Sequence, residues 1–194
     1  MNYRIVESPY YRDIAILKKY NDNTYKLSLC RSLRKKGYEL NKKRITGVNN
    51  VKLDNNISRA KSKVLEYALC NEFDYFVTLT IDKSKFDRYK LKEYYKDFSK
   101  WLNNYNRLNN TKIKYILIPE QHKDGAWHMH GLMSGIHDKH IYRFSLSDNI
   151  PCKIKDLIIA GNDVYSWTSY AKKYGYITMT KIKSVERVSR YITK

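Results

Sequence analysis

A short segment of the sequence, IPEQHKDGAWHMHG at positions 118–131, contains histidine and acidic side chains that can bind a metal ion. Its centre, KDG at 123–125, has the composition of a three-residue hairpin loop whose glycine takes the left-handed position. In that register Glu120 lies directly opposite His128. Because side chains alternate along a strand, His128 and His130 project from one face, and Glu120 shares it. The hairpin therefore predicts a cluster of two imidazoles and one carboxylate.

Such a cluster favours a catalytic divalent ion, because it leaves coordination positions for water or for a phosphate oxygen. We expect Mg²⁺ or Mn²⁺ as the cofactor and no small-molecule cofactor. His122 shares the same face in this register and is the lower-ranking alternative ligand. His137 and His140 stand in a polar stretch beyond the second strand, and we expect both in a surface loop.

A metal ion that polarises a phosphate still needs a nucleophile, and the candidate is Tyr191. On a helix over residues 184–194, the apolar side chains cluster on one side, whereas Arg187, Tyr191 and Lys194 lie on a displaced face. A free phenol ionises near pH 10, so about one tyrosine in a thousand is ionised at neutral pH. Nucleophilic use therefore requires a nearby cation or metal ion, and Lys194 and Arg187 could supply that charge.

A second tyrosine has the same spacing to a lysine. Tyr170 begins the run YAKK at 170–173, which repeats the pattern Y-x-x-K. It lies in a tyrosine-rich run that leads into a predicted strand. We therefore rank Tyr170 second to Tyr191 as the nucleophile.

The elements that would position these side chains follow from hydrophobic periodicity. Helical spacing covers 56–70, with Asp54 or Asn55 as the cap, then 91–105 and 184–194. Strands are predicted at 75–81, 114–121, 126–134 and 175–181, and a short element of either type at 154–160. Helices interleaved with strands, two of which form a tight hairpin, predict an α+β fold with a central antiparallel sheet and helices packed on it.

The chain divides by composition near residue 53. Residues 1–53 are polar, lysine-rich and weakly periodic, with strand-like fragments such as YKLSLC, and they are predicted to form a basic arm with little fold of its own. Residues 54–194 are predicted to form one folded domain. A chain of 194 residues is long enough for one domain and an arm, and too short for a helicase motor in addition.

The charge balance points to a nucleic acid partner. Thirty-eight Lys and Arg against 19 Asp and Glu give a formal charge of +19, which suits a polyanion because each phosphate contact releases condensed counterions. Nineteen tyrosines also suit stacking on unpaired bases, although most of them are expected in the core or at its edge.

The cysteines and the hydropathy pattern indicate the compartment. Cys30, Cys70 and Cys152 are isolated and odd in number, which indicates neither a disulfide framework nor a zinc site. No apolar stretch approaches the roughly 18 residues that cross a bilayer. We expect a soluble protein of the bacterial or host cytosol, with no membrane partner.

Three runs resemble, in order, the motifs of HUH replication initiators of bacteriophages, plasmids and small circular single-stranded DNA viruses. They are FVTLT at 76–80, Glu120 with HMHGL at 128–132, and YITK at 191–194. The run SRAKSKVLEYALCNEFD at 58–74 is also similar to phage-type members. The likeness spans about residues 57–194.

The resemblance implies a nicking domain over 54–194, with the fold expected above, of the RRM-like ferredoxin type. His128 and His130 would bind the ion with Glu120 as third ligand, Tyr191 would attack the scissile phosphate, and Lys194 would assist. The product would be a 5′-phosphotyrosine with a free 3′-hydroxyl that primes replication, and the strand could be rejoined later without ATP.

The same resemblance implies the partners. Single-stranded DNA at an origin or hairpin would be the substrate, and a host helicase is a further expected partner. Thr78, Thr80 and Arg187 are the residues expected to contact nucleic acid. Family members often continue past this helix, so a single-tyrosine enzyme and a fragment ending beside its active site both remain open. A role of the basic arm in origin recognition is a hypothesis.

Other classes remain as alternatives. A single-tyrosine transposase would share the chemistry, whereas relaxases normally place their tyrosine before the histidines. A histidine-triad hydrolase would need a histidine at Leu132, and a 2H phosphoesterase would need a second H-x-Thr or H-x-Ser motif. A non-catalytic nucleic-acid binder could use a similar sheet, with exposed aromatic residues in place of the histidines.

Overall fold

The computed structural model describes residues 10–11, 14–30, 34–35 and 50–193. Their contacts divide the chain into two compact units, Met1–Cys70 and Asn71–Lys194. The division predicted between residues 53 and 54 differs from this one and stays a prediction. Within the described ranges, no helix is both long enough and apolar enough to cross a membrane.

The first unit contains a long helix, α1 (Asn50–Leu69), and two small antiparallel sheets. β2 (Ile14–Lys19) pairs with β3 (Tyr25–Cys30), and β1 (Tyr10–Tyr11) pairs with β4 (Arg34–Lys35). β3 confirms the strand-like character of YKLSLC. An ion pair of 2.9 Å between Lys18 and Glu66 connects the β2–β3 hairpin to α1.

The helix predicted from residue 56 begins earlier, at Asn50. Asp54 and Asn55 therefore lie inside α1, and the prediction that one of them caps it was wrong. Leu53 stands four residues before Ile57, so the helical spacing of apolar residues continues upstream of the expected start.

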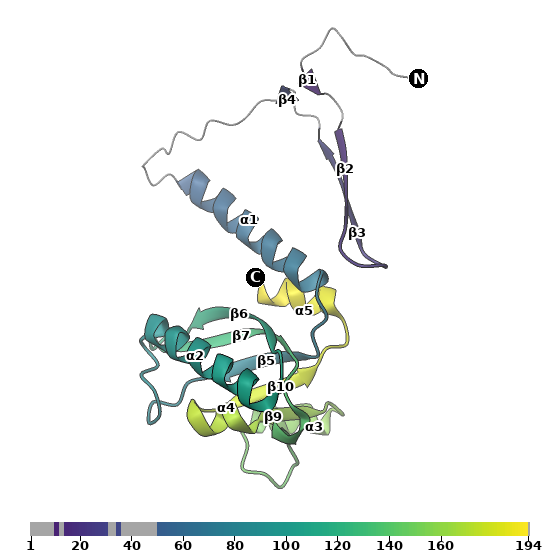
Figure 1. Ribbon diagram of the computed structural model, residues 1–194. Coiled ribbons are helices and arrows are strands. Elements are labelled where there is room, and N and C mark those ends of the chain that lie inside the picture. The colour runs from purple at the N-terminus through teal and green to yellow at the C-terminus, as the bar shows by residue number, and fades with distance from the viewer. Residues whose placement is uncertain (1–9, 12–13, 31–33, 36–49, 194) are drawn as a thin grey trace. The chain divides into compact units, whose positions relative to one another are not determined.

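The second unit is built on one six-stranded antiparallel sheet. In spatial order its strands are β6 (Lys114–Gln121), β7 (Trp127–Ser134), β5 (Tyr75–Thr80), β10 (Ile177–Lys181), β9 (Val164–Trp167) and β8 (Ile141–Arg143). Its helices are α2 (Leu91–Asn109), the 3-10 turn η1 (Asp138–His140), α3 (Cys152–Ile159), α4 (Thr168–Lys173) and α5 (Val185–Ile192). Figure 1 shows these helices packed around the sheet. The predicted α+β class with a central antiparallel sheet is confirmed.

The four predicted strands all form, whereas the edge of the sheet was missed. β8 and β9 are three and four residues long, too short to show periodicity in the sequence. The tyrosine-rich run at 168–173 was expected to lead directly into a strand, and it forms the short helix α4 instead. The element of either type at 154–160 is the helix α3.

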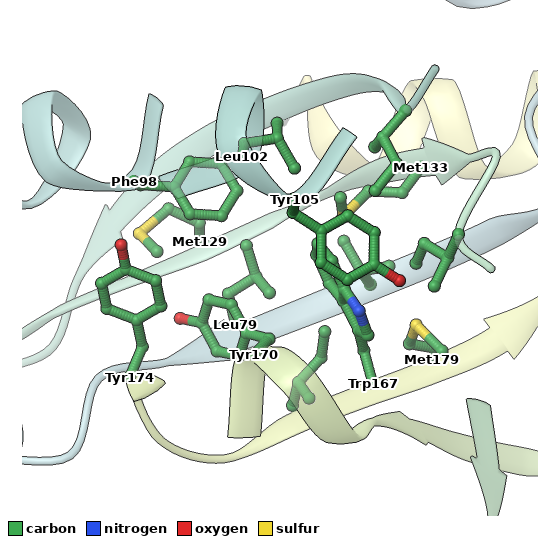
Figure 2. Packing of buried hydrophobic residues seen from close by; sticks show 14 of the residues in the cluster. Leu79, Phe98, Leu102, Tyr105, Met129, Met133, Trp167, Tyr170, Tyr174 and Met179 are labelled. Carbon is green, nitrogen blue, oxygen red and sulfur yellow. The ribbon is translucent and has the colours of Figure 1, made fainter. Parts of the chain in front are cut away.

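One face of the sheet carries the hydrophobic core. Tyr94, Phe98 and Leu102 of α2 are buried there, and Tyr170 of α4 joins them. Figure 2 shows the packing of this core, with residues of the helices against the core-facing residues of the strands. The core is rich in edge-to-face aromatic pairs, a geometry that contributes beyond the apolar area it buries.

Strand alternation separates this core from a second, polar face. Val77 and Leu79 of β5 and Met129 of β7 are fully buried in the core. The residues between them, among them Thr78 and His130, project from the opposite face. The sheet therefore holds its core on one side and presents histidines and hydroxyls on the other.

Gly131 tests how closely β6 and β7 must approach. A Cβ built at Gly131 would lie 1.9 Å from the carbonyl oxygen of Ile116, a backbone atom of β6. Gly131→Ala should therefore lower the free energy of unfolding by about 3 kcal/mol, measured by urea denaturation followed by circular dichroism.

Gly161→Ala is the matched control. No atom lies within 4 Å of a Cβ at Gly161, so only the cost of its φ of +79° remains, about 1 kcal/mol. Equal losses in the two variants would contradict the close strand approach.

Candidate metal centre and its pocket

The β6–β7 hairpin has the register expected from the sequence. Glu120 pairs with His128 across the two strands. The His122 amide donates to the Ala126 carbonyl at 2.8 Å, which closes the loop, and Gly125 has a φ of +86°. The left-handed glycine and the position of Glu120 opposite His128 are both confirmed.

The hairpin brings one carboxylate and two imidazoles together. The Nε2 atoms of His128 and His130 lie 2.9 Å apart, and Glu120 Oε2 lies 3.4 Å and 3.3 Å from them. All three ligand atoms fall within 4.8 Å of one another. Two nitrogen donors and one carboxylate at this spacing could hold a divalent metal ion.

Thr78 on β5 fixes the orientation of one ligand. Its Oγ1 lies 3.0 Å from His130 Nδ1, and the two residues are direct partners in the β5–β7 ladder. If Nδ1 carries the hydrogen and donates it to Thr78, the lone pair of Nε2 points into the cluster. The His130 ring is also parallel to Phe76, with centroids 6.0 Å apart. Thr78 was predicted from the sequence to contact nucleic acid, and its contact with the ligand was not expected.

His122 and His128 complete the histidine row. Their ring centroids are 4.0 Å apart, so His122 lies beside the cluster while remaining exposed. His128 is buried, and its Nδ1 has no hydrogen-bond partner within the described part of the chain. His137 and His140 lie elsewhere, in and beside the 3-10 turn η1, where His140 accepts or donates at 2.6 Å with the Tyr105 hydroxyl.

Burial keeps both ligand imidazoles neutral. Desolvation lowers the pKa of His128, and the neighbouring His122 and His130 lower it further. Desolvation also lowers the pKa of His130, against the opposing effect of Glu120. Only a neutral imidazole can offer Nε2 to a metal ion. The site therefore favours the protonation state that binds metal.

Tyr191 on α5 lies beside this cluster. Its ring centroid is 6.2 Å from that of His130 and 5.7 Å from that of Phe76, edge to face in both pairs. Ser184 caps the helix, accepting from the Arg187 amide. Ile192 is buried while Tyr191 remains 51% exposed, as the helical spacing predicted. Lys194, expected to assist, lies outside the described residues.

Tyr170, the competing nucleophile, lies on the other face of the sheet. It is fully buried in the core, and its hydroxyl is 3.1 Å from that of Tyr94. Burial raises the pKa of its phenol well above the usual value. The structure therefore does not bring Tyr170 to the cluster, and the sequence could not show this because Y-x-x-K occurs in both helices.

A pocket of about 830 Å³ opens on the polar face next to the cluster. Thr78, Thr80 and Arg187, the expected nucleic-acid contacts, all line it together with His122, His128, His130 and Tyr191. The far wall, which comes from α3 and β10, was not predicted from the sequence. Leu157 and Tyr176 there carried no motif, because the distant segments meet only when the sheet forms.

The fold and the site together define an α+β protein with a candidate metal centre next to an exposed tyrosine. The family model described as replication-associated protein ORF2 matches residues 74–194. The chain therefore belongs to this family of replication-associated proteins, which indicates a DNA-binding replication initiator of the phage or plasmid type. Neither the curated proteins nor the solved structures gave a match to the chain.

Thr78→Val tests whether the hydroxyl orients His130. The substitution keeps the β-branched shape and removes the partner of Nδ1, so we expect Mn²⁺ affinity to fall about tenfold, measured by titration calorimetry. Thr178→Val is the control, because Thr178 pairs with Thr78 across β5 and β10 and lines the same pocket. Equal affinity in both variants would contradict the orienting role.

The lowered histidine pKa values predict a pH dependence. Both imidazoles titrate below the ordinary value of about 6.5, so Mn²⁺ affinity should stay constant from pH 8 to about 6.5 and fall only at lower pH. The metal-free protein should lose stability in the same direction, because the unfolded chain binds more protons there. Loss of binding above pH 6.5 in the calorimetric titration would contradict this assignment.

Proposed function

We propose that the chain initiates rolling-circle replication by nicking single-stranded DNA, with Tyr191 as the nucleophile. One observation carries the proposal: an exposed tyrosine on α5 packs edge to face against His130, a member of the Glu-His-His cluster. Family membership supports the role in replication and the DNA partner. The HUH chemistry is the part that the experiments below address.

Glu120, His128 and His130 would hold the ion, and Mg²⁺ or Mn²⁺ fits this donor set. When bound, the ion would polarise the scissile phosphate and offset the negative charge that builds up on its oxygens. The protein's own contribution is to orient His130 through Thr78 and to keep both imidazoles neutral. Arg187, which lines the same pocket, would add a positive charge near the phosphate.

In the proposed step, the Tyr191 oxygen loses its proton and forms a bond to phosphorus. The bond between phosphorus and the 3′-oxygen breaks, and that oxygen takes up a proton. The products are a 5′-phosphotyrosine and a free 3′-hydroxyl. Because one phosphodiester replaces another, attack by a 3′-hydroxyl on the phosphotyrosine reverses the step without ATP.

Two rivals stay open. A single-tyrosine HUH transposase would use the same chemistry, and the replication-associated family favours the initiator. A non-catalytic binder would present aromatic rings on the strands, as RNA-binding sheets do. Here β7 presents His128 and His130 with Glu120 opposite, an arrangement that stacking on bases does not require.

Tyr191→Phe tests the nucleophile. The variant keeps the ring and removes the hydroxyl, so we expect single-stranded DNA binding to persist and the covalent adduct to disappear. The assay incubates the protein and Mn²⁺ with single-stranded oligonucleotides tiled across the replicon that encodes it. Adducts are then detected as species that survive denaturing electrophoresis.

Tyr170→Phe is the control for that experiment. Its hydroxyl lies in the core, so the variant should form the adduct at the level of the unaltered protein. An adduct that persists in Tyr191→Phe and disappears in Tyr170→Phe would show that the nucleophile is misassigned.

Replacing both His128 and His130 with Ala separates the enzyme from the non-catalytic binder. We expect cleavage and Mn²⁺ affinity to be lost together, because the two imidazoles supply two of the three ligands. A chelator should have the same effect on the unaltered protein. DNA binding alone, indifferent to Mn²⁺ and to chelator and without an adduct, would favour the binder.

A further inference from the structure

The pocket next to the metal centre extends well beyond the groups that the nicking chemistry needs. From the histidines it crosses β5 and β10 and ends against α3. Its far wall is apolar, formed by Ile154 and Leu157 of α3, Val164 of β9 and Tyr176 before β10. At about 830 Å³, it falls within the range of about 300–1,000 Å³ typical of sites that enclose a small ligand.

The charges around this pocket suit an anion. Lys153, Lys181, Lys183 and Arg187 line it, and none of the described residues that line it is an aspartate or glutamate. Thr178 and Thr180 add hydroxyls along its floor on β10. An apolar end combined with a cationic border matches the two parts of a nucleotide, a flat base and a phosphate.

Tyr176 adds a polar group inside the apolar wall. Its hydroxyl is buried and has no hydrogen-bond partner within the described part of the chain. Its ring stacks on Phe144, with centroids 6.0 Å apart and planes 24° apart, which restricts its orientation. A buried hydroxyl without a partner costs free energy unless a ligand supplies one, and base edges carry both donors and acceptors.

We propose that this pocket, which we call the base pocket, receives one unpaired nucleotide adjacent to the scissile phosphate. The base lies against Leu157 and Tyr176, and the phosphate lies near Lys183 and Arg187. A base inside a duplex is stacked and paired and cannot reach this wall, so the pocket selects single-stranded DNA. The inference rests on the proposed function, because it takes the nicked strand as the ligand.

Leu157 is the residue that tests the base pocket most directly. It is 40% exposed, so its truncation removes pocket wall without removing core. Ile159 of the same helix is 71% exposed and does not line the pocket, which makes Ile159→Ala the matched control. Thermal melting of both variants confirms that the fold is retained.

The experiment measures binding by fluorescence anisotropy in EDTA, with all variants made in the Tyr191→Phe background so that no cleavage occurs. The probes are a thymidine 15-mer and a 15-mer of abasic tetrahydrofuran units, which keeps the phosphates and removes the bases. Leu157→Ala should weaken binding of the thymidine probe about fivefold or more and leave the abasic probe unchanged. Ile159→Ala should change neither.

The opposite outcomes overturn the proposal. An equal loss on both probes would mean that Leu157 acts through the phosphates or the fold, and no loss on either would mean that no base reaches it. Photocrosslinking of a probe with 4-thiothymidine gives an independent readout, and the crosslink should fall on α3 or Tyr176. Crosslinks confined to other segments would also refute the base pocket.

These results are separable from those on nicking, because no step of the binding assay needs Tyr191 or a metal ion. A protein that discriminates the two probes through Leu157 but never forms an adduct would refute the nicking function alone. A protein that forms the adduct while Leu157→Ala binds normally would refute the base pocket alone.

Discussion

Antiparallel pairing of β7 with β6 on one side and β5 on the other places each group of the candidate metal centre. Glu120 lies across from His128, and Thr78 lies across from His130. Because side chains alternate along a strand, a slip of one residue would turn the histidines into the core and Met129 out of it. The burial of Met129 stabilises the register that exposes the metal ligands on the polar face.

The same alternation divides the aromatic residues between two tasks. Tyr170 and Trp167 fill the core beneath α2, where edge-to-face packing stabilises the sheet. Tyr191 and Tyr176 lie on the polar face and line the pocket. A tyrosine-rich composition therefore serves both packing and ligand contact, and the face of the sheet decides which role each residue takes.

The electrostatics of the polar face agree with a polyanionic ligand. Desolvation keeps the ligand imidazoles neutral, while Lys183 and Arg187 bring positive charge to the pocket from α5 and the segment before it. Glu120 retains 64% of its side-chain exposure, so its carboxylate stays hydrated. Solvent access at the cluster and cations along the pocket together leave a path for a phosphodiester chain.

The sequence by itself determined the hairpin, its register and the three candidate ligands, because alternation and an Asp-Gly turn are local properties of the chain. It also determined that Tyr191 is exposed, since helical spacing separates that residue from Ile192. Only the tertiary structure decided that Tyr170 lies in the core and that Leu157 lines the same pocket as the histidines. Those relations join segments far apart in the sequence, and no local pattern encodes which face of a shared sheet each segment meets.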